Sequence, residues 1–524
     1  MDRTGRALAC GLLVVLLGAC DALMPFGGSG PVVKKDGPTA DAGRDADGAS
    51  SLDVVTDSGD GPLADGPRPP DQTVSSEQVV TPDQALTPDQ ALPTGALTHD
   101  WSFSFGNTWA EEVQGMAVDP SGTTHLTGYF WDTLDFGSGP LTAAGKTDIY
   151  YTSYDASGKH LAAKTFGASQ EDGGSAIAVD GSGNIYLAGS FQGSVDFGGG
   201  VQSSAGKHDI FIASYDAAGS YRFSKTYGDL SDDFGVALAV DGAGDVYLGA
   251  IFMGTVGVGG TQVSSVAKND QDVLLVGLTS TGADRFHKVL GGVGATGVTA
   301  LAVDASGNLH VVGYHYGDVD LGSGTLTSKG QDDIFLASYT STGAHRFSKS
   351  VGGTSYDEAY GLVTDGAGNV YICGTIYGSA DLGGGTLTSA GQGDVLVASF
   401  DSSYAHRWSK LFGGGLDDFG YALATDAFGN VYATGSFEDT VSLGGASYTS
   451  VGQEDVFVAG FTSGGGLVFF KPFGSTSTDY GSAIQVVGLD LYVAGSFKAP
   501  LSFGGATLVN GAPSRDVFLA RFGL

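Results

Sequence analysis

Two series of acidic residues recur along the chain, and their types and spacing could support chemistry. One aspartate opens each of seven similar apolar segments: Asp148, Asp209, Asp272, Asp333, Asp394, Asp455 and Asp516. A second series lies eight residues before a recurring turn: Glu111, Asp172, Asp233, Asp357, Asp418 and Asp479. Thr296 stands where this second series would have a further acid. Carboxylates in such numbers can hold hard cations or accept backbone N–H bonds.

The regular recurrence favours a scaffold role for both series. A residue demanded by loop geometry should return in every unit, with each carboxylate accepting N–H bonds from its own tight loop. The alternative is a ring of Ca²⁺ sites, since hard cations take several oxygen ligands. Neither EF-hand spacing nor a Gly-Gly-x-Gly-x-Asp run accompanies the acids. No resident metal or cofactor is therefore predicted, and Ca²⁺ remains the open alternative.

Residues that occur in one unit alone are the better candidates for a ligand site. Trp131 follows two aromatic residues, and His315 and Tyr316 close the Tyr-His-Tyr run of a later unit. Aromatic and imidazole side chains near an exposed face suit sugar or peptide recognition, although loop-edge aromatics without a role are common. Cys373 takes a small position on an expected strand and is interpreted as packed core.

A repeat of about sixty residues must position these side chains. The turn Asp180-Gly-Ser-Gly-Asn-Ile-Tyr returns with steps of 61, 61, 63, 61 and 61 residues between Asp119 and Asp426, and a worn copy lies at Gly488. Each unit contains four strand signals, which in one copy are 175–179, 184–191, 209–215 and 222–228. Gly is abundant, at 88 residues, and no long segment shows helical spacing of apolar residues. The chain is therefore predicted to be all-β.

The arrangement of the units predicts a closed ring. Four-stranded sheets stacked around an axis cover both faces of the middle strands, as a β-propeller does. The segment 101–106 is a fourth strand that precedes every complete unit, while 516–522 is a third strand with no fourth after it. Pairing of these two segments would complete a seventh blade and leave no open edge. We predict a seven-bladed propeller over 97–524.

The repeated motifs resemble a known family. The Asp-x-x-Gly-Asn-x-Tyr-x-x-Gly core, followed downstream by Asp-(Ile/Val)-Phe-(Ile/Leu/Val)-Ala, is similar to the bacterial β-propeller repeat family named for seven-bladed propellers. The resemblance covers about 101–524 and departs at the Gly488 turn and in the unit around 249–260. It implies the fold and a secreted or surface-attached protein, and it implies no reaction.

The N-terminal region predicts secretion and attachment to a membrane. Residues 1–19 have a basic start and a short apolar run, as in a signal peptide. Leu17-Gly18-Ala19-Cys20 resembles a bacterial lipobox, which implies cleavage before Cys20 and its acylation. An ordinary secretory signal with a chance cysteine is the alternative. Residues 20–96 are rich in proline, aspartate and glycine, and are predicted to be a disordered spacer, with a short partner-binding motif as the alternative.

Composition argues against one class of function, nucleic-acid binding. The net charge of −33 makes nucleic acid an implausible partner. We predict a monomeric, lipid-anchored, non-enzymatic binding or scaffolding module of the cell envelope, at the outer membrane, the cell surface or the periplasmic side of the inner membrane. Its expected partners are the membrane and an envelope protein or glycan. A glycan-binding lectin is one alternative. A propeller hydrolase, lyase or quinone-dependent dehydrogenase is another, although no catalytic constellation occurs in the sequence.

Overall fold

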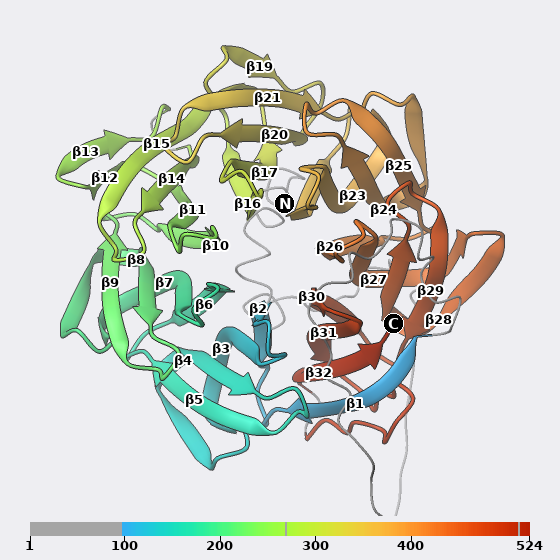
Figure 1. The fold of residues 1–524 in the computed structure, drawn as a ribbon, viewed down its shortest axis with the longest axis horizontal. Coiled ribbons are helices and arrows are strands. Elements are labelled where there is room, and N and C mark those ends of the chain that lie inside the picture. Colours follow the sequence, from blue (N-terminus) through green and yellow to red (C-terminus); the bar gives the residue numbers. More distant parts are fainter. Residues whose placement is uncertain (1–96, 268–269, 512–513) are drawn as a thin grey trace, which may run out of the picture. The chain divides into compact units, whose positions relative to one another are not determined.

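The computed structural model describes residues 97–267, 270–511 and 514–524. The predicted signal peptide, the anchor residue Cys20 and the spacer over 20–96 lie outside the described residues. The described chain forms seven four-stranded antiparallel blades arranged in a ring, which confirms the predicted fold class (Figure 1).

Each blade is an up-and-down sheet whose strands follow one another from the ring axis outward. From the innermost strand outward, the first blade consists of β2 (Glu112–Val118), β3 (Thr124–Asp135), β4 (Pro140–Tyr154) and β5 (His160–Phe166), and the second of β6 (Asp172–Val179), β7 (Ile185–Asp196), β8 (Val201–Tyr215) and β9 (Tyr221–Tyr227). The third blade consists of β10 (Phe234–Val240), β11 (Val246–Phe252), β14 (Asp272–Leu278) and β15 (Asp284–Val293), and the fourth of β16 (Thr296–Val303), β17 (Leu309–His315), β20 (Asp333–Tyr339) and β21 (His345–Val351). The fifth blade consists of β22 (Asp357–Thr364), β23 (Val370–Asp381), β24 (Thr386–Phe400) and β25 (His406–Phe412). The last two are β26 (Phe419–Thr425), β27 (Val431–Leu443), β28 (Ala446–Phe461), β29 (Leu467–Phe473); and β30 (Asp479–Val487), β31 (Asp490–Phe497), β32 (Asp516–Gly523), β1 (Thr98–Phe105).

The two ends of the described chain close the ring. Strand β1 pairs antiparallel with β32, with Phe105 opposite Val517 and Trp101 opposite Arg521. Figure 1 shows β1 lying outside β32 as the outermost strand of the seventh blade. The predicted pairing of 101–106 with 516–522 is confirmed, and it removes the unpaired edges that an open array would expose.

The recurring turn forms through a local hydrogen-bond network. Oδ1 of Asp180 accepts the backbone N–H groups of Ser182 and Asn184, both at 2.9 Å. Its Oδ2 accepts from the Asn184 side chain at 2.8 Å and from the Tyr186 hydroxyl at 3.0 Å. Gly183 has φ of 77°, a conformation that favours glycine. The Asp-x-x-Gly-Asn-x-Tyr motif is therefore one bonded unit that joins the first two strands of a blade.

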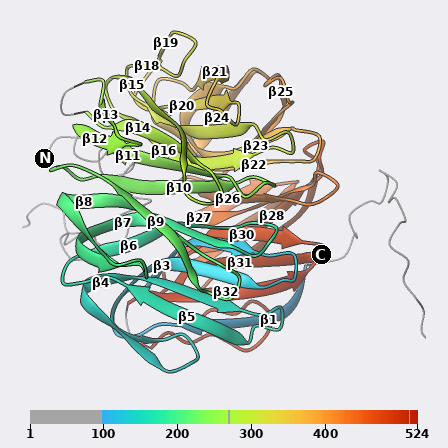
Figure 2. The same ribbon diagram turned by 60° about the vertical axis from the view of Figure 1, so that its left-hand side comes forward.

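The connection between the second and third strands is more ordered than the sequence suggests. The glycine-rich segment between these strands is a hairpin extension in most blades. In the second blade, for example, β7 and β8 continue pairing as far as Asp196 and Val201. In the third and fourth blades the extension separates into the short hairpins β12 (Thr255–Val258) with β13 (Thr261–Ser264) and β18 (Asp318–Asp320) with β19 (Thr325–Thr327). These hairpins lie at the rim of the ring (Figure 2).

The core lies between the blades. Each hydrophobic cluster of buried residues joins two neighbouring blades; Ile149, Leu187 and Phe211, for example, join the first to the second. The cluster that joins the seventh blade to the first contains Phe105, Phe130 and Leu519. Face-to-face packing of this kind buries both faces of the middle strands, as the nearly continuous apolar runs predict.

Up-and-down order places the connections on two opposite faces of the ring. The second-to-third and fourth-to-first connections lie on one face, which we call the entry face, and the Asp180-type turns lie on the other. Both acidic series therefore belong to the entry face. Within the described part of the chain, no helix is long and apolar enough to cross a membrane.

Candidate functional site

The aspartates that open the third strands hold the loop before them. Oδ2 of Asp209 accepts the backbone N–H of Ala205 at 3.0 Å, and Oδ2 of Asp394 accepts that of Ala390 at 3.0 Å. The other five carboxylates of this series each accept an N–H from the same connection. Every member also has a buried Oδ1 with no hydrogen-bond partner among the described residues.

The second acidic series joins two connections of the entry face. Oδ2 of Asp418 accepts the N–H of Gly414 at 2.7 Å, and its Oδ1 accepts the N–H of Glu438 at 3.1 Å. Asp172, Asp233 and Asp479 make the equivalent pair of bonds. The carboxylate thus connects the loop before the first strand to the end of the second.

The two series meet where neighbouring blades join. Burial raises the pKa of Asp418 to about 7, against the two backbone N–H bonds, and the charge of Asp394 in the preceding blade contributes. Burial and the nearby Asp516 likewise act to raise the pKa of Glu111 to about 9, against the N–H bond from Asn107. In the described ranges, no group of three or more histidine, cysteine, aspartate or glutamate residues is placed to hold a metal ion.

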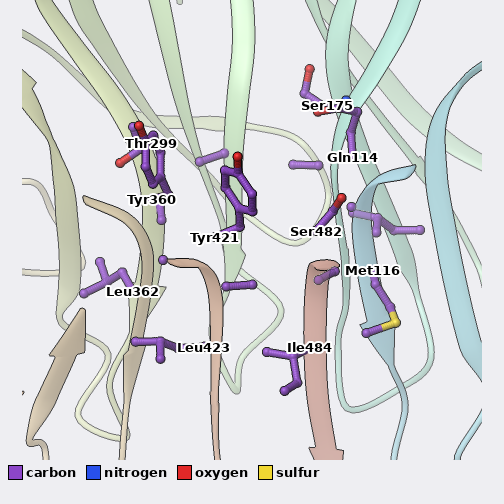
Figure 3. A pocket seen from close by; sticks show the side chains of 18 of the residues that line it. Gln114, Met116, Ser175, Thr299, Tyr360, Leu362, Tyr421, Leu423, Ser482 and Ile484 are labelled. Carbon is purple, nitrogen blue, oxygen red and sulfur yellow. The ribbon is translucent and has the colours of Figure 1, made fainter. Parts of the chain in front are cut away.

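A cavity of about 260 Å³ lies on the ring axis and is lined by the innermost strand of every blade. Its deeper part is an apolar collar formed by one residue from each blade: Met116, Ile177, Leu238, Leu301, Leu362, Leu423 and Ile484. Two positions nearer the entry face lies a second ring, which we call the mouth ring: Gln114, Ser175, Val236, Thr299, Tyr360, Tyr421 and Ser482. Figure 3 shows Tyr421 between Tyr360 and Ser482, with Leu423 beneath it.

Aromatic side chains gather on one side of the mouth. The ring centroids of Tyr360 and Tyr421 are 5.7 Å apart, and those of Tyr421 and Tyr480 are 6.2 Å apart. Phe419 stacks on Tyr421 at 5.6 Å. These residues come from the fifth, sixth and seventh blades, whereas the second, third and fourth blades present Ser175, Val236 and Thr299. The mouth is therefore asymmetric on a symmetric scaffold.

Charged groups adjoin the aromatic side of the mouth. The Tyr480 hydroxyl donates to Oε1 of Glu112 at 2.8 Å. Nη1 of Arg515 lies 3.7 Å from the same oxygen, and its guanidinium carbon lies 5.2 Å from the centre of the Tyr480 ring. Glu112 is 1% exposed. Such a buried carboxylate is stable only with partners, and here it has a cation and a hydroxyl donor.

A family model matches part of the sequence. The model described as SBBP, a beta-propeller repeat, matches residues 407–436, which run from β25 to the start of β27 and include Asp418 and the Asp426 turn. This segment is similar to an SBBP repeat. The units before and after it share its spacing and turn, and the described chain forms seven four-stranded blades.

Solved structures that align with the chain share little sequence with it. No curated protein sequence matches the chain. Among solved structures, the RRP9 WD40 repeats align over 82% of this chain and 99% of theirs, with 10% identity and a TM-score of 0.44. Sqt1 from Chaetomium thermophilum aligns over 82% and 100%, with 11% identity and a TM-score of 0.38. The quinohemoprotein alcohol dehydrogenase from Comamonas testosteroni aligns over 82% and 76%, with 11% identity and a TM-score of 0.35.

The predicted ligand-face residues lie in different blades of the propeller. Trp131 belongs to the first blade, where its ring stacks on that of Trp109 at 6.2 Å and its carbonyl accepts from the Asn107 side chain at 2.7 Å. Trp109 is 55% exposed. His315 and Tyr316 belong to the fourth blade, so the structure does not bring them together with Trp131.

His315 and Tyr316, although adjacent, have opposite environments. His315 is fully buried, with Nδ1 at 3.1 Å from the carbonyl oxygen of Gly317 and Nε2 at 2.8 Å from Oγ of Ser350, so its ring holds strands together. Tyr316 is 53% exposed and lines a second pocket, of about 960 Å³, with Met253 and Val293. Cys373 is fully buried, which raises the pKa of its thiol and fits packed core.

Sequence reasoning missed the mouth of the cavity. Tyr360 and Tyr421 each lie three residues after an acid of the second series, where other units carry smaller side chains. Comparison of the units at that position would have found the mouth ring. The nearby pairing of Glu112 with Arg515 had no signal in the sequence, because the two residues lie near opposite ends of the propeller sequence and meet only when the ring closes.

Proposed function

We propose that this chain is a binding module of the cell envelope, anchored through Cys20 and spaced from the membrane by residues 20–96, that takes its ligand at the mouth of the central cavity. One observation carries the proposal. The third-strand aspartates recur in every blade, yet the mouth ring presents tyrosines on one side and small side chains on the other. A feature that departs from the repeat at a solvent-facing cavity is where recognition chemistry is expected.

The groups at the mouth suit binding better than catalysis. Tyrosines offer flat apolar faces with hydroxyl tips, which recognise ligands at small entropic cost. A hydrolase or lyase would need an acid and a base open to one substrate. Glu112, the acid beside Tyr480, is 1% exposed and is already paired with Arg515 and with the Tyr480 hydroxyl. The carboxylates of both recurring series accept backbone N–H bonds, which supports a structural role for them.

Binding to defined peptide and glycan libraries tests the site. The full chain is expected to retain a subset of probes, and Tyr421→Ser should weaken that binding by at least about tenfold, since an aromatic anchor contributes roughly 1.5 kcal/mol or more. Phe428→Ser is the matched control, because Phe428 belongs to the same blade but lies in the turn on the opposite face and is 37% exposed. Equal binding by both variants, or conversion of a probe to product, would contradict the proposal.

Membrane attachment has its own test. Cys20→Ser should move the protein from the membrane fraction to the soluble fraction, because acyl chains on Cys20 provide the proposed anchor. Protease added to intact cells should remove the propeller if it faces the outside. Retention of the Cys20→Ser protein in membranes would contradict the lipid anchor.

Glycan binding on the first blade is a second candidate function. The stacked indoles of Trp109 and Trp131 form an aromatic platform on the entry face, partly open to solvent. Sugar rings pack their C–H faces on such platforms. Saturable binding on a glycan array that is lost in Trp131→Ala and kept in Tyr421→Ser would favour this function over binding at the central mouth.

A further inference from the structure

Each junction between blades brings two particular positions together on the entry face. The first position precedes the third-strand aspartate, and the second follows the second-series position of the next blade. From the first junction to the closing one, the pairs are Thr147/Gly173, His208/Phe234, Gln271/Gly297, Asp332/Glu358, Gly393/Phe419, Glu454/Tyr480 and Arg515/Glu112.

Backbone hydrogen bonds hold these pairs in the same relation. The N–H of Asp233 donates to the carbonyl of His208 at 2.8 Å, that of Asp357 to Asp332 at 2.7 Å, and that of Glu111 to Arg515 at 3.1 Å. Where both positions carry a side chain, the two side chains can meet as a result, as they do at the second junction and at the closing one. The rings of His208 and Phe234 are 5.3 Å apart.

The closing junction shows what the paired positions can hold. Arg515 lies 3.7 Å from the Glu112 carboxylate and over the ring of Tyr480, whose hydroxyl donates to the same carboxylate. A guanidinium between a carboxylate and an aromatic face is stabilised by charge and by the ring quadrupole together. This junction carries its own cation.

The junction of the fourth and fifth blades has the acids and the aromatic ring, but the paired positions supply no cation. Asp332 and Glu358 occupy these positions and are 6% and 5% exposed. The Tyr360 hydroxyl donates to Oε2 of Glu358, while Oε1 has no hydrogen-bond partner among the described residues. In the same described ranges, the Asp332 carboxylate has neither a hydrogen bond nor an ion pair. Lys329, on the same connection, donates its Nζ to the carbonyl of Gly352 at 3.1 Å.

Electrostatics agree with this geometry. Burial raises the pKa of Glu358 to about 7, against the Tyr360 hydrogen bond, and the charges of Asp332 and Asp357 add to the rise. Burial and the adjacent Asp333 raise the pKa of Asp332 to about 6. Buried carboxyls that lack a cation take up protons in this way, and a cation bound between them would restore the charged forms.

We propose that the Asp332–Glu358 junction, at the rim of the central cavity beside Tyr360, binds the ammonium or guanidinium group of the ligand. This inference rests on the proposed role of the cavity mouth and gives the ligand its chemical class. An organic cation fits better than Ca²⁺, because hard cations take six to eight oxygen ligands and this junction offers two carboxylates and an aromatic ring. A polyamine and a basic side chain of a partner protein both carry the required group.

Calorimetric titration of the full chain at pH 7.5 tests the proposal, with spermidine, a short Arg-Lys peptide and CaCl₂ as separate probes. Spermidine or the peptide should bind, and Asp332→Asn should weaken that binding roughly 30-fold, since removal of one partner of a buried charge pair has effects of this size. Glu171→Gln is the matched control. It removes one negative charge from the same face at an exposed ion pair with Lys146, and it should leave affinity unchanged.

A second variant places the missing cation in the chain. Asp332→Arg reproduces at this junction the Arg515–Glu112 pair, so it should abolish binding of both probes while keeping or raising the melting temperature. Binding of spermidine alone identifies a small amine as the source of the cation, and binding of the peptide identifies a partner protein.

Three results would overturn the proposal: no binding of either organic probe, binding that Asp332→Asn leaves intact, or Ca²⁺ binding that Asp332→Asn removes. Failure here is distinguishable from failure of the proposed function. A neutral library probe that is lost in Tyr421→Ser and retained in Asp332→Asn would keep the central mouth as the binding site and reject the cationic class.

Discussion

Each third-strand aspartate lies against a glycine near the end of a fourth strand or directly after it. These glycines recur in every blade: Gly106, Gly167, Gly228, Gly291, Gly352, Gly413 and Gly474. A methyl group on Gly228 would overlap the carboxyl group of Asp209. None of the seven glycines has a positive φ, so they are required by packing and not by backbone conformation. At the residue scale, the aspartate and the glycine act as one unit.

Replacement of one such glycine should therefore destabilise the propeller. Gly228→Ala is expected to lower the free energy of unfolding by about 1–3 kcal/mol, because overpacking must displace the carboxyl group of Asp209 and the loop bonded to it. Urea unfolding of the full chain measures this change. Gly181→Ala is the control: no atom lies within 4 Å of an added methyl group there, so its effect should stay within about 0.5 kcal/mol. Equal effects of the two substitutions would refute the packing argument.

At the scale of elements, strand β1 is the piece that closes the ring. Its last residue, Phe105, is 6% exposed. The Phe105 ring lies 5.3 Å from that of Phe136 and 6.1 Å from that of Tyr150, both in the first blade. Because β1 is itself part of the seventh blade, Phe105 links the first and last blades through the core.

Truncation of this side chain should weaken the whole propeller. Phe105→Ala is expected to lower the free energy of unfolding by about 3–5 kcal/mol, the usual effect of removing a buried phenyl group. Leu230→Ala, at a side chain that is 80% exposed, provides the control and should have little effect. Thermal or urea unfolding gives both values. Wild-type stability in Phe105→Ala would mean that closure of the ring contributes little.

At the scale of the whole molecule, buried acids are distributed around the ring. Burial, against the backbone N–H bonds, raises the pKa of Asp233, Asp357 and Asp418 to about 7 and that of Asp172, Asp272 and Asp479 to about 6. A pKa raised by folding means that the folded state favours the protonated acid. The stability from these groups is fully present below their unfolded pKa, near 3.8, and is lost as pH rises through 6 to 7.

The propeller should therefore be more stable at pH 5 than at pH 8. Below pH 4 the trend should reverse. Hydrogen bonds lower the pKa of the turn residues Asp180 and Asp365 despite burial. The stability that these two carboxylates contribute is therefore lost as the pH falls through their lowered pKa. Urea unfolding at a series of pH values measures the curve. Asp418→Asn should reduce the pH dependence of the free energy of unfolding between pH 5 and 8. A urea midpoint of the unsubstituted protein that rises from pH 5 to pH 8 would contradict the raised pKa of the buried acids.

The sequence alone determined the number of blades, the order of the strands and the closure of the ring. This was possible because the blade-forming signals are local: the Asp180 turn is bonded within seven residues, and apolar runs mark the strands on both sides of it. The number of units then follows from the recurrence of these signals about every 61 residues. The hairpin extensions between second and third strands were not predicted, because their glycine-rich composition is typical of loops.

Only the tertiary structure decided which side chains share a site. Tyr360, Tyr421 and Tyr480 converge because successive blades present equivalent positions to one axis. Asp332 meets Glu358, and Arg515 meets Glu112, across junctions that depend on how one sheet packs on the next. His315 and Tyr316 show the same limit, since adjacent residues became buried core and exposed pocket wall. The repeat specifies each blade through contacts nearby in sequence, whereas the mouth and its charges depend on contacts between blades.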